Sequence, residues 1–343
     1  MASVFLRLLS LVGLVLGSLG AEFLETELWG GSVPLSKDGV SQRGTTSPMS
    51  SKISSVNVPK LLKLNDEAKR LQGKYAQKNL SVLVIPGGGY DFISSFNEGT
   101  EVCAYLNSIG ISAYMLLYRH HPYRHPVPLL DAFRGLRLVR KLEAEKKDGV
   151  GGVGVIGFSA GGHLAASILT FADRDPSVYL GIPGAEDAAE GGSTFTGDDL
   201  AEQFSCRPDF SVLVYPVISM EPGVTHDRSR RNIAGSAIGT PLSTPLDRLL
   251  SLEKSVLRDE HEFKMRKVSP LIAPVLIIHS GDDQTVPVEN ALRFYKSLNS
   301  LNGHAVNEGT RDSDRIECDV EMRLYSYGNH GFGLHKRGKK RLA

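Results

Sequence analysis

The sequence predicts a single α/β domain with a mostly parallel central sheet and helices on both of its faces. Its 343 residues are enough for one large domain with a sizeable core. From Leu80 onward, short β-rich runs alternate with helical patterns, which is typical of a parallel sheet buried on both faces. Polar and glycine-rich segments follow several of these runs, at the sheet edge where such folds bind their ligands.

The expected strands are short runs rich in branched and aromatic side chains, at residues 81–85, 111–118, 153–156, 211–215, 274–278 and 321–327. Between them, apolar spacing indicates helices over residues 98–108, 129–147, 160–171 and 288–298. These elements place the main domain at residues 80–335. Two polar stretches, near 181–203 and 302–319, are expected to be surface insertions in this domain.

The first 20 residues have the pattern of a secretory signal peptide. A single Arg7 precedes an apolar run, and small residues follow that run up to Gly20. An uncleaved anchor is the alternative, but the run is too short to span hydrocarbon comfortably, so no stable membrane span is expected. We therefore expect a protein that is secreted or lies in the lumen of the secretory pathway.

Two further segments flank the main domain. Residues 21–79 should form an N-terminal arm, mostly irregular because Ser, Gly, Thr and Pro are frequent, together with the first edge strands. Residues 336–343 form a basic tail, which we expect to be a solvated end.

Composition gives no sign of a nucleic-acid partner, because the formal net charge is +1 and charged residues make up 22% of the chain. Three cysteines allow one disulfide, and a pairing of Cys206 with Cys318 stays open. Cys103 falls in an apolar helical pattern, which favours a buried thiol. The sequence carries no signal for the oligomeric state.

Two patterns could indicate a metal or a cofactor, but neither has the required context. His120, His121 and His125 lie in one loop without an acidic or cysteine partner at ligand spacing, which favours a structural role. The glycines of residues 149–154 fit a dinucleotide-binding pattern, yet they precede a strand, whereas that fingerprint requires glycines between a strand and a helix. No cofactor and no metal are therefore expected.

The pattern G-x-S-x-G occurs at residues 157–161, directly after an expected buried strand. Small residues on both sides of Ser159 would let the chain turn sharply from strand to helix and hold the hydroxyl above the sheet edge. A serine nucleophile needs that geometry. Five residues match easily by chance in a chain with 36 glycines, so the neighbouring motifs must decide.

Three consecutive glycines, residues 87–89, follow the first strand of the main domain. Their backbone N–H groups can face a ligand without obstruction by side chains, as the binding of an oxyanion requires. We expect Gly88 and Gly89 to supply one half of an oxyanion hole and the N–H of Ala160 to supply the other. An ordinary flexible turn is the alternative.

Candidates for an acid and a base follow the last two strands. Asp282 and Asp283 come after residues 274–278, and Asp283 is favoured because the acid of such hydrolase loops stands four residues before the proline. Asp282 is then expected to be a turn or capping residue. His330 lies in a glycine-rich loop after the last strand, where an imidazole can act as a general base. His163 is expected to pack against the glycine loop.

The candidates occur in the order Ser159, Asp283, His330, which is the order found in α/β-hydrolases. With its other motifs, the chain resembles the bifunctional acetylxylan/feruloyl esterases, near the prolyl-oligopeptidase-like hydrolases. The resemblance covers residues 80–334, and its motifs lie at residues 84–90, 118–119, 125–132, 157–165, 207–210, 215–218, 286–290 and 330–333.

This resemblance implies an α/β-hydrolase fold and a metal-free serine esterase with the triad Ser159, Asp283 and His330. The expected substrates are short-chain, acetyl-type esters of small molecules or carbohydrates. Two alternatives within the same fold stay open. One is a prolyl-oligopeptidase-like serine peptidase or small-amide hydrolase, and the other is a non-catalytic binding protein.

Overall fold

The computed structural model describes residues 22–31, 33–37, 47–65, 79–146, 151–172, 200–236, 244–256, 271–302 and 317–334. The expected signal peptide at 1–20 and the basic tail at 336–343 lie outside these residues, as does most of each polar insertion, near 181–203 and 302–319. No helix in the described ranges is long and apolar enough to cross a membrane.

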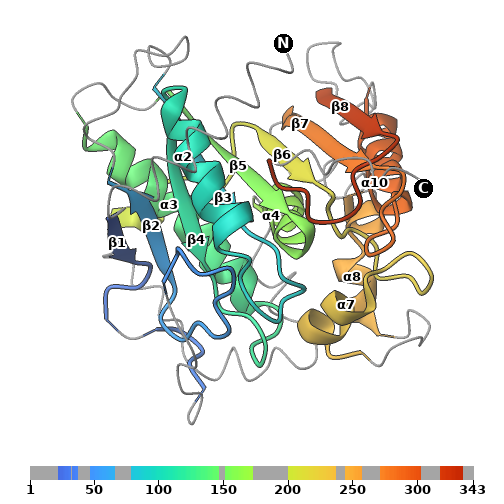
Figure 1. Ribbon diagram of the computed structural model, residues 1–343, viewed down its shortest axis with the longest axis horizontal. Helices are drawn as coiled ribbons and strands as arrows, with labels where there is room; N and C mark the ends of the chain where they lie inside the picture. The colour runs from blue at the N-terminus through green and yellow to red at the C-terminus, as the bar shows by residue number, and fades with distance from the viewer. Residues whose placement is uncertain are drawn as a thin grey trace, which may run out of the picture.

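In the described part of the chain, eight strands form one sheet in the order β1-β2-β4-β3-β5-β6-β7-β8 (Figure 1). The strands are β1 (Phe23–Glu27), β2 (Lys60–Leu64), β3 (Leu80–Ile85), β4 (Ser112–Leu117), β5 (Gly152–Phe158), β6 (Ser211–Val214), β7 (Leu271–Ser280) and β8 (Glu317–Tyr325). All neighbouring pairs from β4 to β8 are parallel, whereas β1 and β2 join that edge as antiparallel strands. The prediction of a mostly parallel sheet is confirmed.

Helices connect the parallel strands, and their main members are α2 (Glu101–Ser108), α3 (Val127–Ala144), α4 (Ser159–Phe171) and α10 (Glu289–Ser300). Each of the four expected helices is present, with its ends shifted by no more than three residues. The expected helix at 98–108 differs in detail, because its first turn is a π-helix, η3 (Phe96–Thr100). Shorter helices are η4 (Leu200–Gln203), α7 (Asp227–Ala234) and α8 (Pro245–Leu250).

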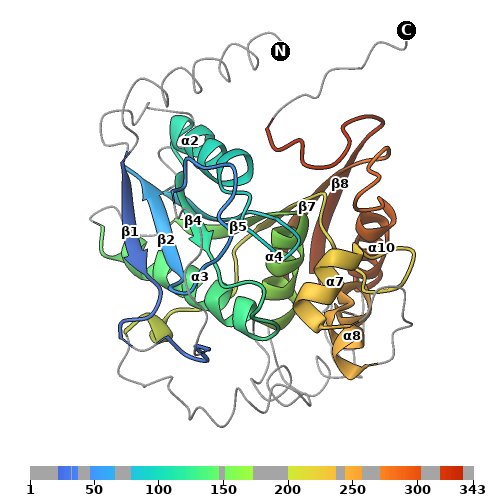
Figure 2. The ribbon, with the colours of Figure 1, turned by 60° about the horizontal axis from the view of Figure 1, so that its bottom comes forward.

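The direction of the crossovers decides which face each helix covers. From β3 to β4 the chain steps towards one edge of the sheet, and from β4 onward it steps towards the other. Because such crossovers are right-handed, α2 lies on one face, and α3 and α4 pack side by side on the other (Figure 2). The sheet is therefore buried on both sides at its centre, and residues Ser81–Ile85 of β3 are all buried.

A buried ion pair fastens the N-terminal arm to this core. Arg119 donates through Nε and Nη2 to the carboxylate of Asp131 at 2.9 and 2.6 Å, and both side chains are fully buried. Trp29 donates to the same carboxylate at 3.0 Å, and Arg119 also donates to the carbonyl of Pro34. Trp29 is 7% exposed and packs against the hydrophobic core.

Replacing Asp131 by alanine should therefore be costly, since it leaves the Arg119 guanidinium buried without its partner. We expect Asp131→Ala to lower the free energy of unfolding, measured by urea denaturation, by about 3–5 kcal/mol. The control is Lys60→Ala, which removes an ion pair with Glu25 whose side chains are 30% and 48% exposed. That variant should lose less than about 1 kcal/mol. Similar losses in both variants would contradict the role of the buried pair.

Candidate active site

Ser159 stands at the point where β5 ends and α4 begins. Its φ is +51°, a left-handed conformation that non-glycine residues adopt at strained turns, and the residue is 5% exposed. The turn needs small neighbours. A Cβ atom on Gly157 would lie 2.3 Å from the carbonyl oxygen of Gly161, and one on Gly161 would lie 2.2 Å from that of Ile85. The expected nucleophile-elbow geometry is therefore present.

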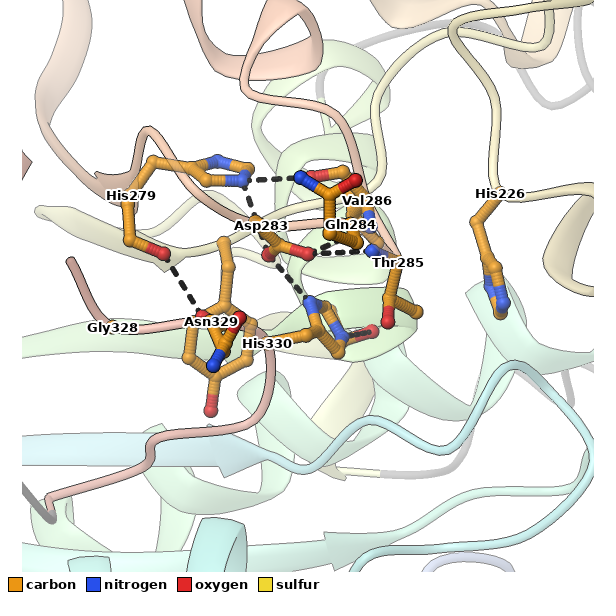
Figure 3. A network of polar contacts seen from close by, with 12 residues as sticks. His226, His279, Asp283, Gln284, Thr285, Val286, Gly328, Asn329 and His330 are labelled. Atoms are coloured by element: carbon orange, nitrogen blue, oxygen red, sulfur yellow. Dashed lines mark hydrogen bonds and ion pairs between the residues drawn. The ribbon is translucent and has the colours of Figure 1, made fainter. Parts of the chain in front are cut away.

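A chain of hydrogen bonds joins the three predicted residues (Figure 3). Nε2 of His330 lies 2.9 Å from Oγ of Ser159, and Nδ1 of His330 lies 2.7 Å from Oδ2 of Asp283. Because a carboxylate can only accept, Nδ1 carries the hydrogen and Nε2 is left to accept from the serine hydroxyl. Three loops, at the ends of β5, β7 and β8, thus bring together residues that are far apart in the sequence.

The carboxylate of Asp283 is held from several sides. Its Oδ1 accepts from the backbone N–H groups of Thr285 and Val286, both at 2.9 Å. Nε2 of the buried His279 donates to the carbonyl of Val286 at 3.0 Å and lies 3.4 Å from Oδ2 of Asp283. Burial alone would raise the pKa of Asp283, but the bonds from His279, His330 and the backbone hold it well below its usual range. The carboxylate is therefore ionised at neutral pH.

Asp282 has a more specific place than the turn or capping position expected for it. Its Oδ1 accepts from the backbone N–H groups of Gly328 and Asn329 at 2.9 and 2.8 Å, across the gap between two loops. The hydroxyl of Ser280 donates to the carbonyl of Asn329 at 2.9 Å. The two adjacent aspartates thus bind different parts of the loop that follows β8 at residues 326–334, the histidine loop. Asp282 binds its backbone and Asp283 binds the imidazole of His330.

The glycine loop lies directly beside Ser159. A Cβ atom on Gly87 would lie 2.8 Å from Cβ of Ser159, so no larger residue fits there. Gly88 and Gly89 have φ values of +129° and +65°, which glycine adopts readily. Their N–H groups have no acceptor among the described residues, whereas the N–H of Gly87 donates to Glu98 at 2.9 Å. Ala160 is in the first turn of α4, where backbone N–H groups lack a partner within the helix.

Helix α7 covers the other side of the glycine loop. Nδ2 of Asn232 donates to the carbonyl of Gly89 at 2.9 Å. His226, the residue before the first residue of α7, is half-buried, and its Cε1 lies 3.4 Å from the position of a Cβ on Gly89. Figure 3 shows His226 to one side of the His330 network, with no bond to it. Burial first, and then the charges of His330 and Arg228, lower the pKa of His226.

His163 and the histidines at residues 120, 121 and 125 lie outside the hydrogen-bond chain of Ser159, His330 and Asp283, and the backbone N–H of His125 donates to the carbonyl of Ile233. Nδ1 of His163 lies 2.9 Å from the hydroxyl of Tyr90 in the glycine loop, which confirms its packing role, and Nε2 lies 2.9 Å from the carbonyl of Leu250. His120 is buried, and the N–H of His121 donates to the carbonyl of Tyr90. Across the described residues, no group of three or more metal-ligating side chains could hold a metal ion. The three cysteines are buried and none forms a disulfide in the described part of the chain, so Cys206 and Cys318 are not paired.

Three polar residues around these loops were not predicted from the sequence, namely Glu98, Tyr215 and His279. Each falls inside or next to an expected helix or strand, where its neighbours are apolar or helical. His279 carried one signal, because it ends a strand and stands four residues before Asp283. Tyr215 begins one of the motifs that carry the family resemblance, at residues 215–218, but nothing there indicated its contacts, and Glu98 carried no signal, since these contacts join segments far apart in the chain.

The buried histidines predict how stability depends on pH. Burial lowers the pKa of His163 and of His120 to about 4, whereas an unfolded histidine titrates near 6.5. Between these pH values the unfolded chain binds protons that the folded chain does not. The free energy of unfolding should therefore fall as the pH falls from 6.5 to 4, by at most about 1.4 kcal/mol per pH unit for each histidine.

Replacing His163 by glutamine should remove one of these two contributions. Urea denaturation at pH 7 and pH 4.5 should show a smaller loss of stability for His163→Gln than for the wild type. Ser167→Ala, which changes a buried side chain on the same helix that does not titrate, is the control and should lose as much as the wild type. An unchanged pH dependence in His163→Gln would contradict the assignment.

Comparisons with known proteins agree with this architecture. The α/β hydrolase fold family matches residues 82–307. An acetylxylan esterase of Xylanibacter ruminicola is 28% identical over 277 residues, which are 80% of this chain and 46% of that protein. Endo-1,4-beta-xylanase B of Butyrivibrio fibrisolvens is 29% identical over 228 residues, or 63% of this chain and 29% of that protein. The chain thus spans less than half the length of these two relatives.

Solved structures give the same result. The acetyl ester-xyloside bifunctional hydrolase of Caldicellulosiruptor lactoaceticus superposes with a TM-score of 0.60 at 32% identity, covering 91% of this chain and 88% of that one. The carboxylesterase Cest-2923 of Lactobacillus plantarum, at 16% identity and a TM-score of 0.53, shares the fold and covers 83% of this chain and 86% of its own. The chain belongs to the α/β hydrolase fold family.

Proposed function

We propose that this protein is a serine carboxylesterase that hydrolyses short-chain, acetyl-type esters, with a carbohydrate as the alcohol part. The observation that carries the proposal is the continuous hydrogen-bond chain from Ser159 through His330 to Asp283, at 2.9 and 2.7 Å. A hydroxyl in line with an imidazole that is oriented by a buried carboxylate is the arrangement of an activated serine.

In the first step, Oγ of Ser159 attacks the ester carbonyl carbon, and Nε2 of His330 takes the hydroxyl proton. Asp283 keeps the imidazole in the required tautomer and stabilises the imidazolium that forms. The low pKa of its carboxyl supports this role, because the group stays negatively charged while His330 gains its proton.

The attack places a negative charge on the former carbonyl oxygen. We assign the N–H groups of Gly88, Gly89 and Ala160 to bind it, since the two glycine N–H groups have no acceptor among the described residues. Collapse of the tetrahedral intermediate breaks the bond to the alcohol oxygen. That oxygen leaves as the alcohol after it takes the proton from His330.

Water completes the cycle by attacking the acyl-enzyme. His330 takes a proton from the water as it adds to the acyl carbon, and the proton then returns to Oγ of Ser159 as the acid leaves. His330 thus mediates each proton transfer in this scheme. In the overall reaction the acyl group is transferred from an alcohol to water.

The names of two relatives support the choice of substrate. One is an acetylxylan esterase, and the structure at 32% identity is an acetyl ester-xyloside bifunctional hydrolase. Both names refer to esters of acetyl groups and to xylose-containing carbohydrates. We carry over the acetyl group and the carbohydrate alcohol as the proposed substrate class.

Replacing Ser159 by alanine tests the nucleophile. We expect Ser159→Ala to lower the kcat for p-nitrophenyl acetate by roughly 10⁶-fold, down to the background rate, as loss of a triad serine does. The fold should persist, because alanine fits the space. Ser167→Ala is the control, since Ser167 is buried on the same helix and donates only to the carbonyl of His163. Turnover that survives in a folded Ser159→Ala protein would refute the assignment.

The acyl group is tested with p-nitrophenyl esters of increasing chain length. The proposal predicts the highest kcat/KM for acetate and a decline towards octanoate, followed by release of acetate from acetylated xylan. A preference for long acyl chains would contradict the substrate class. Serine-dependent cleavage of peptides or formamides without ester turnover would contradict the esterase activity itself.

A further inference from the structure

The carboxyl group of Glu98 lies buried between the glycine loop and the histidine loop. Glu98 belongs to η3 and is 4% exposed. Its Oε2 accepts from the N–H of Gly87 at 2.9 Å, and its Oε1 accepts from the hydroxyl of Tyr215 at 2.8 Å. Both oxygens therefore act as acceptors, which is the bonding pattern of a carboxylate. Nothing in the reaction scheme above uses this group.

Tyr215 carries the contact onward to the histidine loop. Its hydroxyl accepts from the N–H of Gly333 at 3.0 Å. Its ring lies edge-on to the ring of His330, with centroids 4.8 Å apart, and to that of Phe332 at 4.6 Å. Tyr215 is fully buried and has a φ of +38°, so its position after β6 is tightly constrained. One carboxyl thus reaches both loops, through Gly87 on one side and Tyr215 on the other.

Glu98 is also close to the nucleophile. A Cβ atom on Gly87 would lie 3.0 Å from Oε2 of Glu98 and 2.8 Å from Cβ of Ser159. The π-helix that carries Glu98 cannot shift easily, because a Cβ on Gly99 would lie only 2.1 Å from Sδ of Met115 on β4. The carboxyl is therefore held in one place beside the turn at Ser159.

Burial disfavours the charged form of Glu98, whereas its hydrogen-bond partners favour it. Burial raises the pKa of Glu98 above its usual value, and hydrogen bonds from Tyr215, Gly87 and Ser94 together with the charge of His330 offset part of that rise. The titratable groups that face it are Tyr215, Tyr118 and His330. Of these, only His330 gains a positive charge during the reaction, so the carboxylate stabilises that charge most when it forms.

Resting on the esterase proposal, we propose that Glu98 is a positioning residue for the same site. Its carboxylate fixes the glycine loop through Gly87 and the histidine loop through Tyr215, and its negative charge stabilises the imidazolium of His330. It touches neither the substrate nor the reacting atoms, and it acts through these two loops.

Glu98→Gln keeps the shape of the side chain, removes its charge and replaces one acceptor oxygen by a donor. We expect kcat for p-nitrophenyl acetate to fall by about 10–100-fold with KM changed less than about threefold, since the substrate does not contact Glu98. His330 should then hold its proton less tightly, so the acid limb of the pH profile of kcat should move to lower pH. Glu98→Asp should keep the position of the acid limb, because the charge is retained. It should lower kcat, because the shorter side chain cannot reach both Gly87 and Tyr215.

Two further variants separate positioning from general destabilisation. Tyr215→Phe keeps the ring beside His330 and removes the link to Glu98, so kcat should fall, while the acid limb should move less than in Glu98→Gln because the carboxyl group is retained. Glu143→Gln is the matched control, because Glu143 is also a buried glutamate that accepts from a tyrosine hydroxyl, that of Tyr114. It should leave kcat and the acid limb unchanged.

The proposal is overturned if folded Glu98→Gln keeps the wild-type kcat and acid limb, or if only its melting temperature changes. The esterase proposal fails separately, when the wild type shows no Ser159-dependent ester turnover. In that case the test is the NMR titration of the His330 ring, assigned with His330→Asn. Its midpoint should move to lower pH in Glu98→Gln but not in Glu143→Gln, and an unmoved midpoint overturns the proposal.

Discussion

The site depends on one backbone constraint, the sharp turn at Ser159 between β5 and α4. The left-handed φ of +51° at Ser159 aims the hydroxyl away from the sheet, and the turn closes only because Gly157 and Gly161 carry no side chains. A second close contact sets Gly161 against the carbonyl of Ile85, at the end of β3. Gly161 therefore packs against both the turn that carries Ser159 and the strand that leads into the glycine loop.

The parallel register of the sheet brings the other loops to the same edge. β6 and β7 pair from Ser211 with Val275, and β7 and β8 pair through Ser280 with Tyr325, so the segments after them emerge side by side. Polar contacts then lock these segments together. Asp282 holds the backbone of the histidine loop and Asp283 its imidazole, while Glu98 and Tyr215 join that loop to the glycine loop. Two aspartates and one glutamate thus fix the geometry around His330.

Sequence patterns predicted the sheet, its helices and the residues Ser159, Asp283 and His330, because each of these has a local signal: a hydrophobic period, a glycine turn or a strand end. They did not predict the roles of Glu98 and Tyr215, which are 117 positions apart in the chain and meet only in the folded protein. Asp282 shows the same limit, since its contact to Asn329 crosses 47 positions. Local patterns thus identify candidate residues at strand ends and turns, whereas the contacts that hold these residues in place depend on the tertiary fold.

The central claim is that His330 activates Ser159 as the nucleophile of this site. Labelling with a fluorophosphonate, followed by mass spectrometry of the digested protein, tests it without any assumption about the substrate. The account predicts one adduct, on Ser159, formed by the wild type and lost in His330→Asn. An adduct only on another residue, or labelling of Ser159 at the same rate without His330, would contradict it.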